Sequence, residues 1–141
     1  MAKLVKLDSL RADLKLQSEG TWQPAPWPGV RLRVRSIDYE AYTSARDQER
    51  ERLAAQYLSA AKIPDRVWIP ILGRLLAEHI LLEWDGISPA YDADTAEDVL
   101  TAPDGKAMRE AVVIAAQRVG VREIEFVAEL EKNSAGASGI N

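Results

Sequence analysis

Hydrophobic and charged residues alternate strictly along residues 30–35, which read Val-Arg-Leu-Arg-Val-Arg. This period of two is typical of a β-strand with one buried face, so the three apolar side chains are expected to point inward and the three arginines outward. We expect a second short strand at Leu14–Gln17. The two strands would pair as a β-hairpin over about residues 12–36, with the Gly- and Pro-rich residues 20–29 as a connecting loop.

Helical spacing replaces this alternation after Ser36, whose side chain is suited to cap a helix. The stretch that follows contains no Gly or Pro up to Ala61 and is rich in Ala, Glu, Arg and Leu. It predicts the longest helix, over about residues 37–61. The core face of this helix would carry Tyr42, Leu53 and Tyr57.

The most apolar segment lies between Pro64 and Gly86. Two prolines leave its start open, because either the helix begins near Pro70 or a first turn from Asp65 is kinked there. We favour one main helix over about residues 70–84, which Gly86 ends in a left-handed conformation. Since this helix is apolar over most of its circumference, we expect it to be buried or to lie at an interface.

Three shorter helices are expected in the rest of the chain. Asp94 or Thr95 can cap the first of them, and a Pro-Asp-Gly turn at residues 103–105 precedes the second. The third follows Gly120. Their expected ranges are about residues 94–101, 106–119 and 121–132.

Composition agrees with one soluble globular domain, since the chain has 141 residues, of which 47% are hydrophobic and 28% charged. We therefore expect a single α+β domain over residues 1–132, mainly α-helical, with an N-terminal β-hairpin. Residues 133–141 have little apolar surface to bury, so we expect them to form a flexible C-terminal tail.

Charge is unevenly distributed along the chain. The formal net charge is −4, but residues 1–36 hold seven basic and three acidic residues, whereas the remainder holds eleven basic and nineteen acidic ones. Such asymmetry is compatible with head-to-tail self-association into a homo-oligomer, with a basic patch for an acidic partner, or with a solvated basic hairpin. We hypothesise that Arg31, Arg33 and Arg35 contact the acidic face of a neighbour or partner.

Most catalytic chemistry lacks the residues that it needs. The chain has no cysteine and one histidine, His79, so thiolate metal sites and cysteine nucleophiles are excluded. The acidic residues near Asp94 lack the glycine and glutamate of a calcium loop, and Lys106 lacks the rest of a phosphate-binding loop. We expect no enzyme, no cofactor and no metal site.

Neither the first residues nor the apolar segment has the pattern of a signal peptide or of a membrane-spanning helix. No apolar stretch follows the first residues as in a signal peptide, and Ile69–Trp84 is interrupted by charges and is too short to span a bilayer. We expect a cytoplasmic protein without a membrane partner.

Four segments together resemble the tail assembly chaperones of long-tailed bacteriophages, over about residues 25–133. The first is a valine- and arginine-rich strand that leads into a tyrosine-containing helix, and the most distinctive is an apolar helix ended by Trp-Asp-Gly. The others are an acidic-capped short helix and a terminal Glu-Lys-Asn. Their ranges are Arg31–Tyr42, Leu75–Ile87, Asp94–Leu100 and Phe126–Asn133.

The resemblance implies a non-enzymatic protein of the host-cell cytoplasm that is absent from the finished particle. Such a chaperone binds the tape measure protein and helps to recruit tail tube subunits. The alternatives are a small structural or connector protein of the particle and, third, a nucleic-acid-binding regulator, which the acidic remainder of the chain disfavours. The candidate partner-binding residues are Arg31, Arg33, Arg35, Trp27, Trp68 and Trp84.

Overall fold

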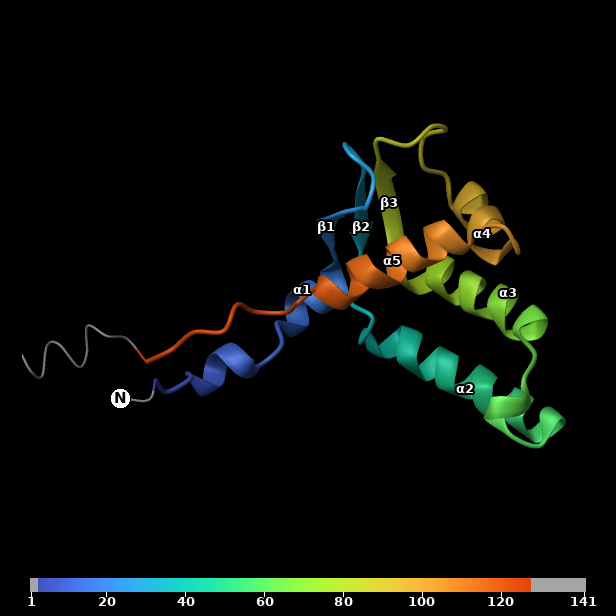
Figure 1. Ribbon diagram of the computed structural model, residues 1–141, viewed down its shortest axis with the longest axis horizontal. Coiled ribbons are helices and arrows are strands. Elements are labelled where there is room, and N and C mark those ends of the chain that lie inside the picture. The colour runs from blue at the N-terminus through green and yellow to red at the C-terminus, as the bar shows by residue number, and fades with distance from the viewer. Residues whose placement is uncertain (1–2, 128–141) are drawn as a thin grey trace, which may run out of the picture. The chain divides into compact units, whose positions relative to one another are not determined.

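A computed structural model describes residues 3–127 of the chain, which have a mixed α+β fold that is 55% helical (Figure 1). The α+β, mainly helical class expected from the sequence is confirmed. The chain divides into two compact units, a terminal unit made of Met1–Asp13 with Val121–Asn141 and a central unit made of Leu14–Gly120. The expectation of one domain over residues 1–132 stays a prediction.

The central unit begins with a helix and contains five α-helices and three strands. Its five α-helices are α1 (Leu14–Glu19), α2 (Glu40–Tyr57), α3 (Asp65–Leu75), α4 (Ala93–Thr101) and α5 (Lys106–Arg118). A 3-10 turn, η2 (Ala60–Lys62), follows α2, and a π-helical segment, η3 (Leu76–Ile80), continues α3. Its three strands are β1 (Thr21–Pro24), β2 (Arg31–Val34) and β3 (Leu81–Asp85).

The strands form an antiparallel sheet in the order β1-β2-β3. Val30, Leu32 and Val34 are buried and the arginines between them are not, which confirms the predicted alternation along β2. The buried face of the sheet packs against α5, whose alanines allow a close approach (Figure 1). The opposite face carries the arginines.

The first strand of the hairpin is not the expected one. The prediction of a strand at Leu14–Gln17 is wrong, because this segment lies in α1, and β1 lies within the expected loop over residues 20–29. Gly20, with φ of +82°, donates its N–H to the carbonyl of Leu16 and ends α1. The hairpin therefore spans residues 21–34 rather than about 12–36. Leu14 and Leu16 of α1 are both exposed, so their spacing of two residues did not indicate the buried face of a strand.

The helix expected over residues 70–84 is confirmed over residues 70–80 and wrong at both of its bounds. It begins at Asp65 with Pro70 inside it, which is the other start that the two prolines left open, and Leu81–Asp85 is the strand β3 rather than its last turn. Leu81–Asp85 is a strand rather than helix because it pairs with β2 and becomes the third strand of the sheet. Its side chains differ in burial, with Leu81 and Trp84 buried and Glu83 and Asp85 exposed. A continuous apolar run does not by itself separate a buried helix from a buried strand.

The remaining expectations for the central unit are largely confirmed. The helices expected at residues 94–101 and 106–119 are α4 and α5, and Gly86 is left-handed with φ of +85°. The long helix is shorter than the expected residues 37–61, because it runs over Glu40–Tyr57. Ser36 does not cap it: the buried Ser36 hydroxyl accepts a hydrogen bond from the N–H of Asp38 instead.

The terminal unit contains two chain segments that pair as extended backbone. Val5 forms an isolated antiparallel bridge with Phe126, and a 3-10 turn, η1 (Leu7–Leu10), follows. The helix expected over residues 121–132 is therefore wrong for residues 121–127, which are not helical. Its remaining residues and the tail expected at 133–141 lie outside the described residues.

The hydrophobic core belongs to the central unit. Tyr42 of α2, Leu75 and Leu76 at the α3–η3 junction, Leu100 of α4 and Val112 of α5 meet there with the inner face of the sheet. Among the described residues, no helix is long and apolar enough to cross a membrane.

Candidate partner-binding groove

A groove of about 700 Å³ opens on the central unit between α3 and α5. Both helices pack on α4 and η3 rather than closely on each other, which leaves the space between their outer faces open. Its lining consists of Asp65, Ile69, Leu72, Pro103, Lys106, Arg109, Glu110, Val113, Ile114 and Gln117.

Helical spacing explains why these side chains share one groove. Residues of α5 three and four positions apart lie on one face, so Val113 and Ile114 stand one turn from Glu110 and Gln117. Ile114 is 43% exposed although it is a large apolar residue. The groove thus has an apolar floor that the protein itself leaves uncovered.

Charged side chains of both signs border this floor. Lys106 and Glu110 are exposed one turn apart on α5, and Asp65 is exposed at the start of α3. An apolar floor with a charged border fits an amphipathic helix, whose apolar stripe would lie in the groove while its polar flanks meet the border.

Arg109 fixes the end of the groove near α4. This arginine is buried, and its guanidinium donates hydrogen bonds to the carbonyls of Leu100, at 3.0 Å, and Ala102. Those carbonyls lie at the C-terminal end of α4, where helix carbonyls lack intrahelical partners. The charge is therefore engaged within the chain and serves to join α4 to α5.

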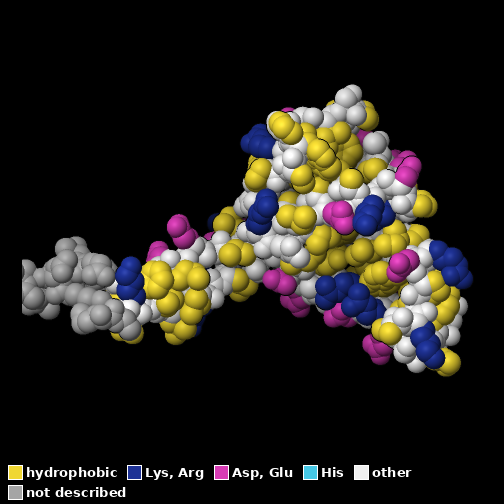
Figure 2. All heavy atoms as spheres, viewed as in Figure 1, with side chains coloured by type: hydrophobic (Ala, Val, Ile, Leu, Met, Phe, Trp, Pro, Cys, Tyr) yellow, Lys and Arg dark blue, Asp and Glu magenta, His cyan; other side chains and the backbone are white. Residues whose placement is uncertain are grey.

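The apolar surface continues beyond both ends of the groove. A hollow of about 260 Å³ at Pro70 and Thr101 shares four lining residues with it, and another of about 350 Å³ shares Ile114 and reaches Pro24. Figure 2 shows hydrophobic side chains gathered over α3 and α5 with charged ones beside them. The exposed apolar band is therefore longer than the groove alone.

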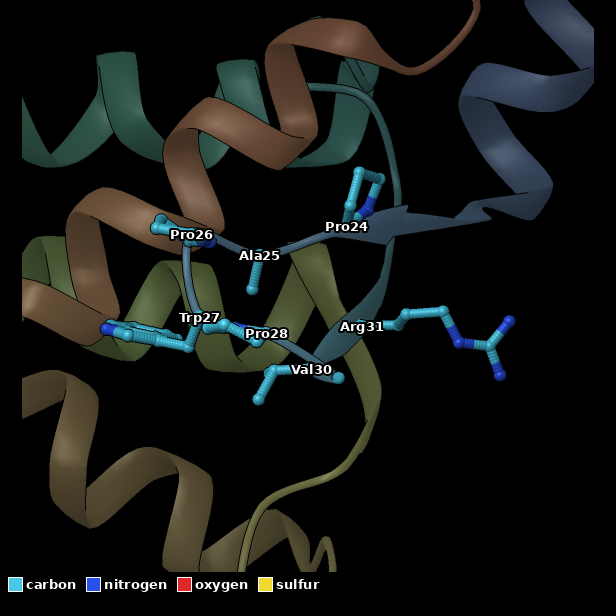
Figure 3. Close-up of a pocket in the computed structure, with 8 residues that line it drawn as sticks. Pro24, Ala25, Pro26, Trp27, Pro28, Val30 and Arg31 are labelled. Atoms are coloured by element: carbon cyan, nitrogen blue, oxygen red, sulfur yellow. The ribbon is translucent and has the colours of Figure 1, made fainter.

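The loop between β1 and β2 encloses a further hollow of about 440 Å³, lined by its own prolines and by Trp27 (Figure 3). The Trp27 ring and the Arg31 side chain point to opposite sides of this loop. These two candidate partner-binding residues do not form one contact surface.

The arginines of β2 have partners inside the central unit. Arg31 pairs with Asp85 of β3 at 3.2 Å and lies over the Trp22 ring, and the register places Arg33 opposite Glu83. Arg35 donates to the carbonyl oxygens of Ser18, at 2.8 Å, and His79, at 3.2 Å. The three arginines thus contact groups of their own chain, which favours a structural role for them.

Two of the three candidate tryptophans lie within the packing of the fold. Trp84 is buried, donates its indole N–H to the carbonyl of Pro89 at 3.0 Å and meets the Tyr91 ring edge-on. Trp68 is half-buried under the Arg50 guanidinium, which joins α2 to α3. Trp27 alone of the three is exposed, at 39%.

Ile69 and Leu72 of the groove belong to the apolar segment Ile69–Trp84, which was expected to be buried or to lie at an interface, whereas Val113 and Ile114 were not selected from the sequence. A signal was present, because residues 111–116 of α5 are all apolar, more than one buried face of a helix uses. Ala111, Val112, Ala115 and Ala116 are buried in the structure, whereas Val113 is half-buried and Ile114 is exposed. Val113 and Ile114 form a second apolar face of α5, and this face lines the groove.

Groups capable of catalysis do not gather in this region. The His79 Nε2 atom lies 3.7 Å from a carboxylate oxygen of Glu78, and the backbone carbonyl of His79 accepts a hydrogen bond from Arg35.

The N-cap of α4 is Asp92 rather than Asp94 or Thr95, so the cap expected from the sequence is displaced by two or three residues. Burial raises the pKa of Tyr91, with the nearby Asp92 charge adding to the effect. Within residues 3–127 no three acidic or histidine side chains converge on a metal-binding geometry.

No family model, curated protein or solved structure matches this chain.

Proposed function

We propose that this chain is a non-enzymatic tail assembly chaperone of a long-tailed bacteriophage or prophage. It binds the tape measure protein in the host-cell cytoplasm, helps to recruit tail tube subunits and is absent from the finished particle. The groove between α3 and α5 is the observation that carries this proposal, together with the four sequence segments that resemble the chaperone family.

The chemistry of the groove suits a long helical client. The α5 face from Lys106 to Gln117 is about 18 Å long at 1.5 Å per residue, which corresponds to about three turns of a docked helix. The floor supplies apolar contacts, and the border can pair with charges on the flanks of the client helix. A client that repeats such helices would expose apolar stripes to water until the tube covers them, and a groove of this kind shields one stripe.

The test is co-expression with the tape measure protein of the same phage or prophage. We expect the tape measure protein to be soluble and to co-purify with the wild-type chain, and to be insoluble when the chain is omitted. Insoluble and unbound tape measure protein in both cases contradicts the proposal. Detection of the chain in purified particles would instead support a structural or connector protein.

A groove variant with a matched control locates the contact. Ile114→Glu places a charge on the floor at an exposed helix position where glutamate is well tolerated. Leu58→Glu makes the same change at a residue that is 83% exposed and does not line the groove. We expect Ile114→Glu to lose co-purification and Leu58→Glu to retain it. Equal co-purification of both variants would show that the client binds elsewhere.

A further inference from the structure

Basic residues outnumber acidic ones along the apolar band, which consists of the groove between α3 and α5 and the two hollows that continue it. Four basic and two acidic side chains line these three spaces, so the lining has a formal charge of +2, whereas the whole chain has −4. The apolar band is therefore a basic strip on an acidic protein. Its charged residues are Arg66, Lys106, Arg109 and Arg118 against Asp65 and Glu110.

Ion pairs within the described chain do not cancel this basic excess. The buried Arg109 guanidinium donates only to the carbonyls of Leu100 and Ala102, which have no net charge. The exposed Arg118 guanidinium donates to the Pro24 carbonyl at 3.4 Å, again a neutral acceptor. Within residues 3–127 none of the four basic residues of the band forms an ion pair. Their charge remains to attract a bound partner.

Two helix N-termini add positive potential at one end of the apolar band. Asp65 and Lys106, in the first turns of α3 and α5, both line the groove. The residues that precede these helices are Pro64 and Gly105, and neither makes a side-chain cap hydrogen bond. Because the first N–H groups of a helix lack intrahelical partners, they add partial positive charge to that of Lys106.

Lys106 and Arg118 stand at the two ends of the apolar face of α5. The helix between them is about 18 Å long at 1.5 Å per residue. Val113, which is half-buried, and Ile114, which is exposed, lie between these two basic residues. A docked helix with an apolar stripe and a carboxylate near each end would therefore meet the floor and both basic groups together.

We propose that the occupant of the apolar band is an amphipathic helix with acidic flanks. Its apolar side chains lie on Val113 and Ile114, and its carboxylates pair with Lys106 and Arg118. Charge complementarity selects acidic flanks over basic ones, and the apolar floor selects a protein helix over a nucleic acid. This inference rests on the proposed function, because it names the chemistry of the client helix.

Two synthetic peptides of about 18 residues test this chemistry on the intact chain. Both carry leucines at helical spacing, and one has glutamate and the other lysine at every flanking position, since these two residues favour a helix equally. Fluorescence anisotropy measures the binding of each labelled peptide. We expect the glutamate peptide to bind about tenfold more tightly, and the difference to shrink at high salt. The net charge of −4 opposes this preference, so non-specific attraction to the chain does not produce it.

Arg118→Glu tests the arginine at the end of the band, with Arg52→Glu as the matched control. Arg52 is an arginine of α2 whose side chain is 59% exposed and which lines none of the three spaces. We expect Arg118→Glu to weaken binding of the glutamate peptide about fivefold and to strengthen binding of the lysine peptide. Arg52→Glu should change neither affinity. Circular dichroism checks that both variants are folded.

Equal affinity for the two peptides, tighter binding of the lysine peptide, or no binding of either peptide overturns the proposal. So does an affinity for the glutamate peptide that Arg118→Glu leaves unchanged. A wild-type dimer that Ile114→Glu converts to a monomer in sedimentation equilibrium would identify a second copy as the occupant, and it overturns the proposal as well.

The same measurements separate this inference from the proposed function. Co-purification of the tape measure protein together with equal affinity for the two peptides would leave the chaperone function standing without the acidic helix. Preference for the glutamate peptide without co-purification would leave the acidic helix standing and exclude the tape measure protein as its source.

Discussion

Gly73 permits the close approach of α3 to α4, and Gly73→Ala is expected to destabilise the protein although alanine favours a helix. A Cβ atom at this position would lie 2.0 Å from the Leu100 carbonyl oxygen and 2.8 Å from the Thr101 nitrogen. Both are backbone atoms, so no side-chain rotation relieves the overlap. The two helices must separate, and the packing of Leu75 and Leu100 in the core is disturbed.

The expected magnitude follows from two opposing effects. Alanine gains about 1 kcal/mol over glycine in a helix interior. Overpacking costs about 1–3 kcal/mol, and the upper end applies because the obstacle is backbone. The net loss in the free energy of unfolding is therefore about 2 kcal/mol, which lowers the Tm of a domain of this size by roughly 10 °C.

Urea unfolding followed by circular dichroism measures this loss. Gly29→Ala is the matched control, because its Cβ would meet no atom within 4 Å and only its φ of +78° opposes a side chain. That strain costs about 1 kcal/mol. A Gly73→Ala protein as stable as the wild type, or more stable than Gly29→Ala, would refute the packing argument and with it the position of the α3 wall of the groove.

Two further predictions concern a titrating residue and a helix cap. Burial raises the pKa of Tyr42 above its ordinary value of 10.0, although the nearby Arg46 charge opposes this rise. The neutral Tyr42 hydroxyl therefore contributes to the free energy of unfolding at pH values below 10.0, and this contribution is lost as the pH rises through the pKa of the folded state. Urea midpoints at neutral and strongly alkaline pH should therefore differ less in Tyr42→Phe than in the wild type, and an equal difference would contradict the assignment. The Asp92 carboxylate accepts from the N–H groups of Asp94 and Thr95 at 3.1 Å, so Asp92→Ala should lower the free energy of unfolding by about 1 kcal/mol. Asp94→Ala is the control and should change it little; equal losses in the same urea assay would show that Asp92 is not the cap.

Local pattern was sufficient where one element has one buried face. The alternation around Leu32 placed β2 correctly, and breakers with helical spacing placed α4 and α5. In each case the local preference agrees with the tertiary environment.

Local pattern failed where a distant partner decides the structure. Leu81–Asp85 is a strand because β2, some fifty residues earlier, offers an edge to it. Residues 121–127 are not helical, and Phe126 among them pairs with Val5 at the other end of the chain. Neither pairing leaves a mark in the local hydrophobic period, which fits a helix equally well.

The candidate site shows the same division. Arg31 was selected as a partner-binding residue because of the strand alternation and the charge asymmetry of the chain. Its ion pair with Asp85 could not be predicted, because most of β3 was expected to be helix. The groove arises because α3 and α5 pack on α4 and η3 rather than closely on each other, and this depends on the tertiary arrangement rather than on either sequence segment.

Hydrogen exchange of the complex with the tape measure protein tests the central claim most directly. If a client helix lies in the groove, amide protection should rise along residues 65–72 of α3 and 106–117 of α5 on binding. The surface around Leu58 should not change, and Ile114→Glu should abolish the added protection. Protection confined to other surfaces, or protection at the groove that persists in Ile114→Glu, would contradict the account.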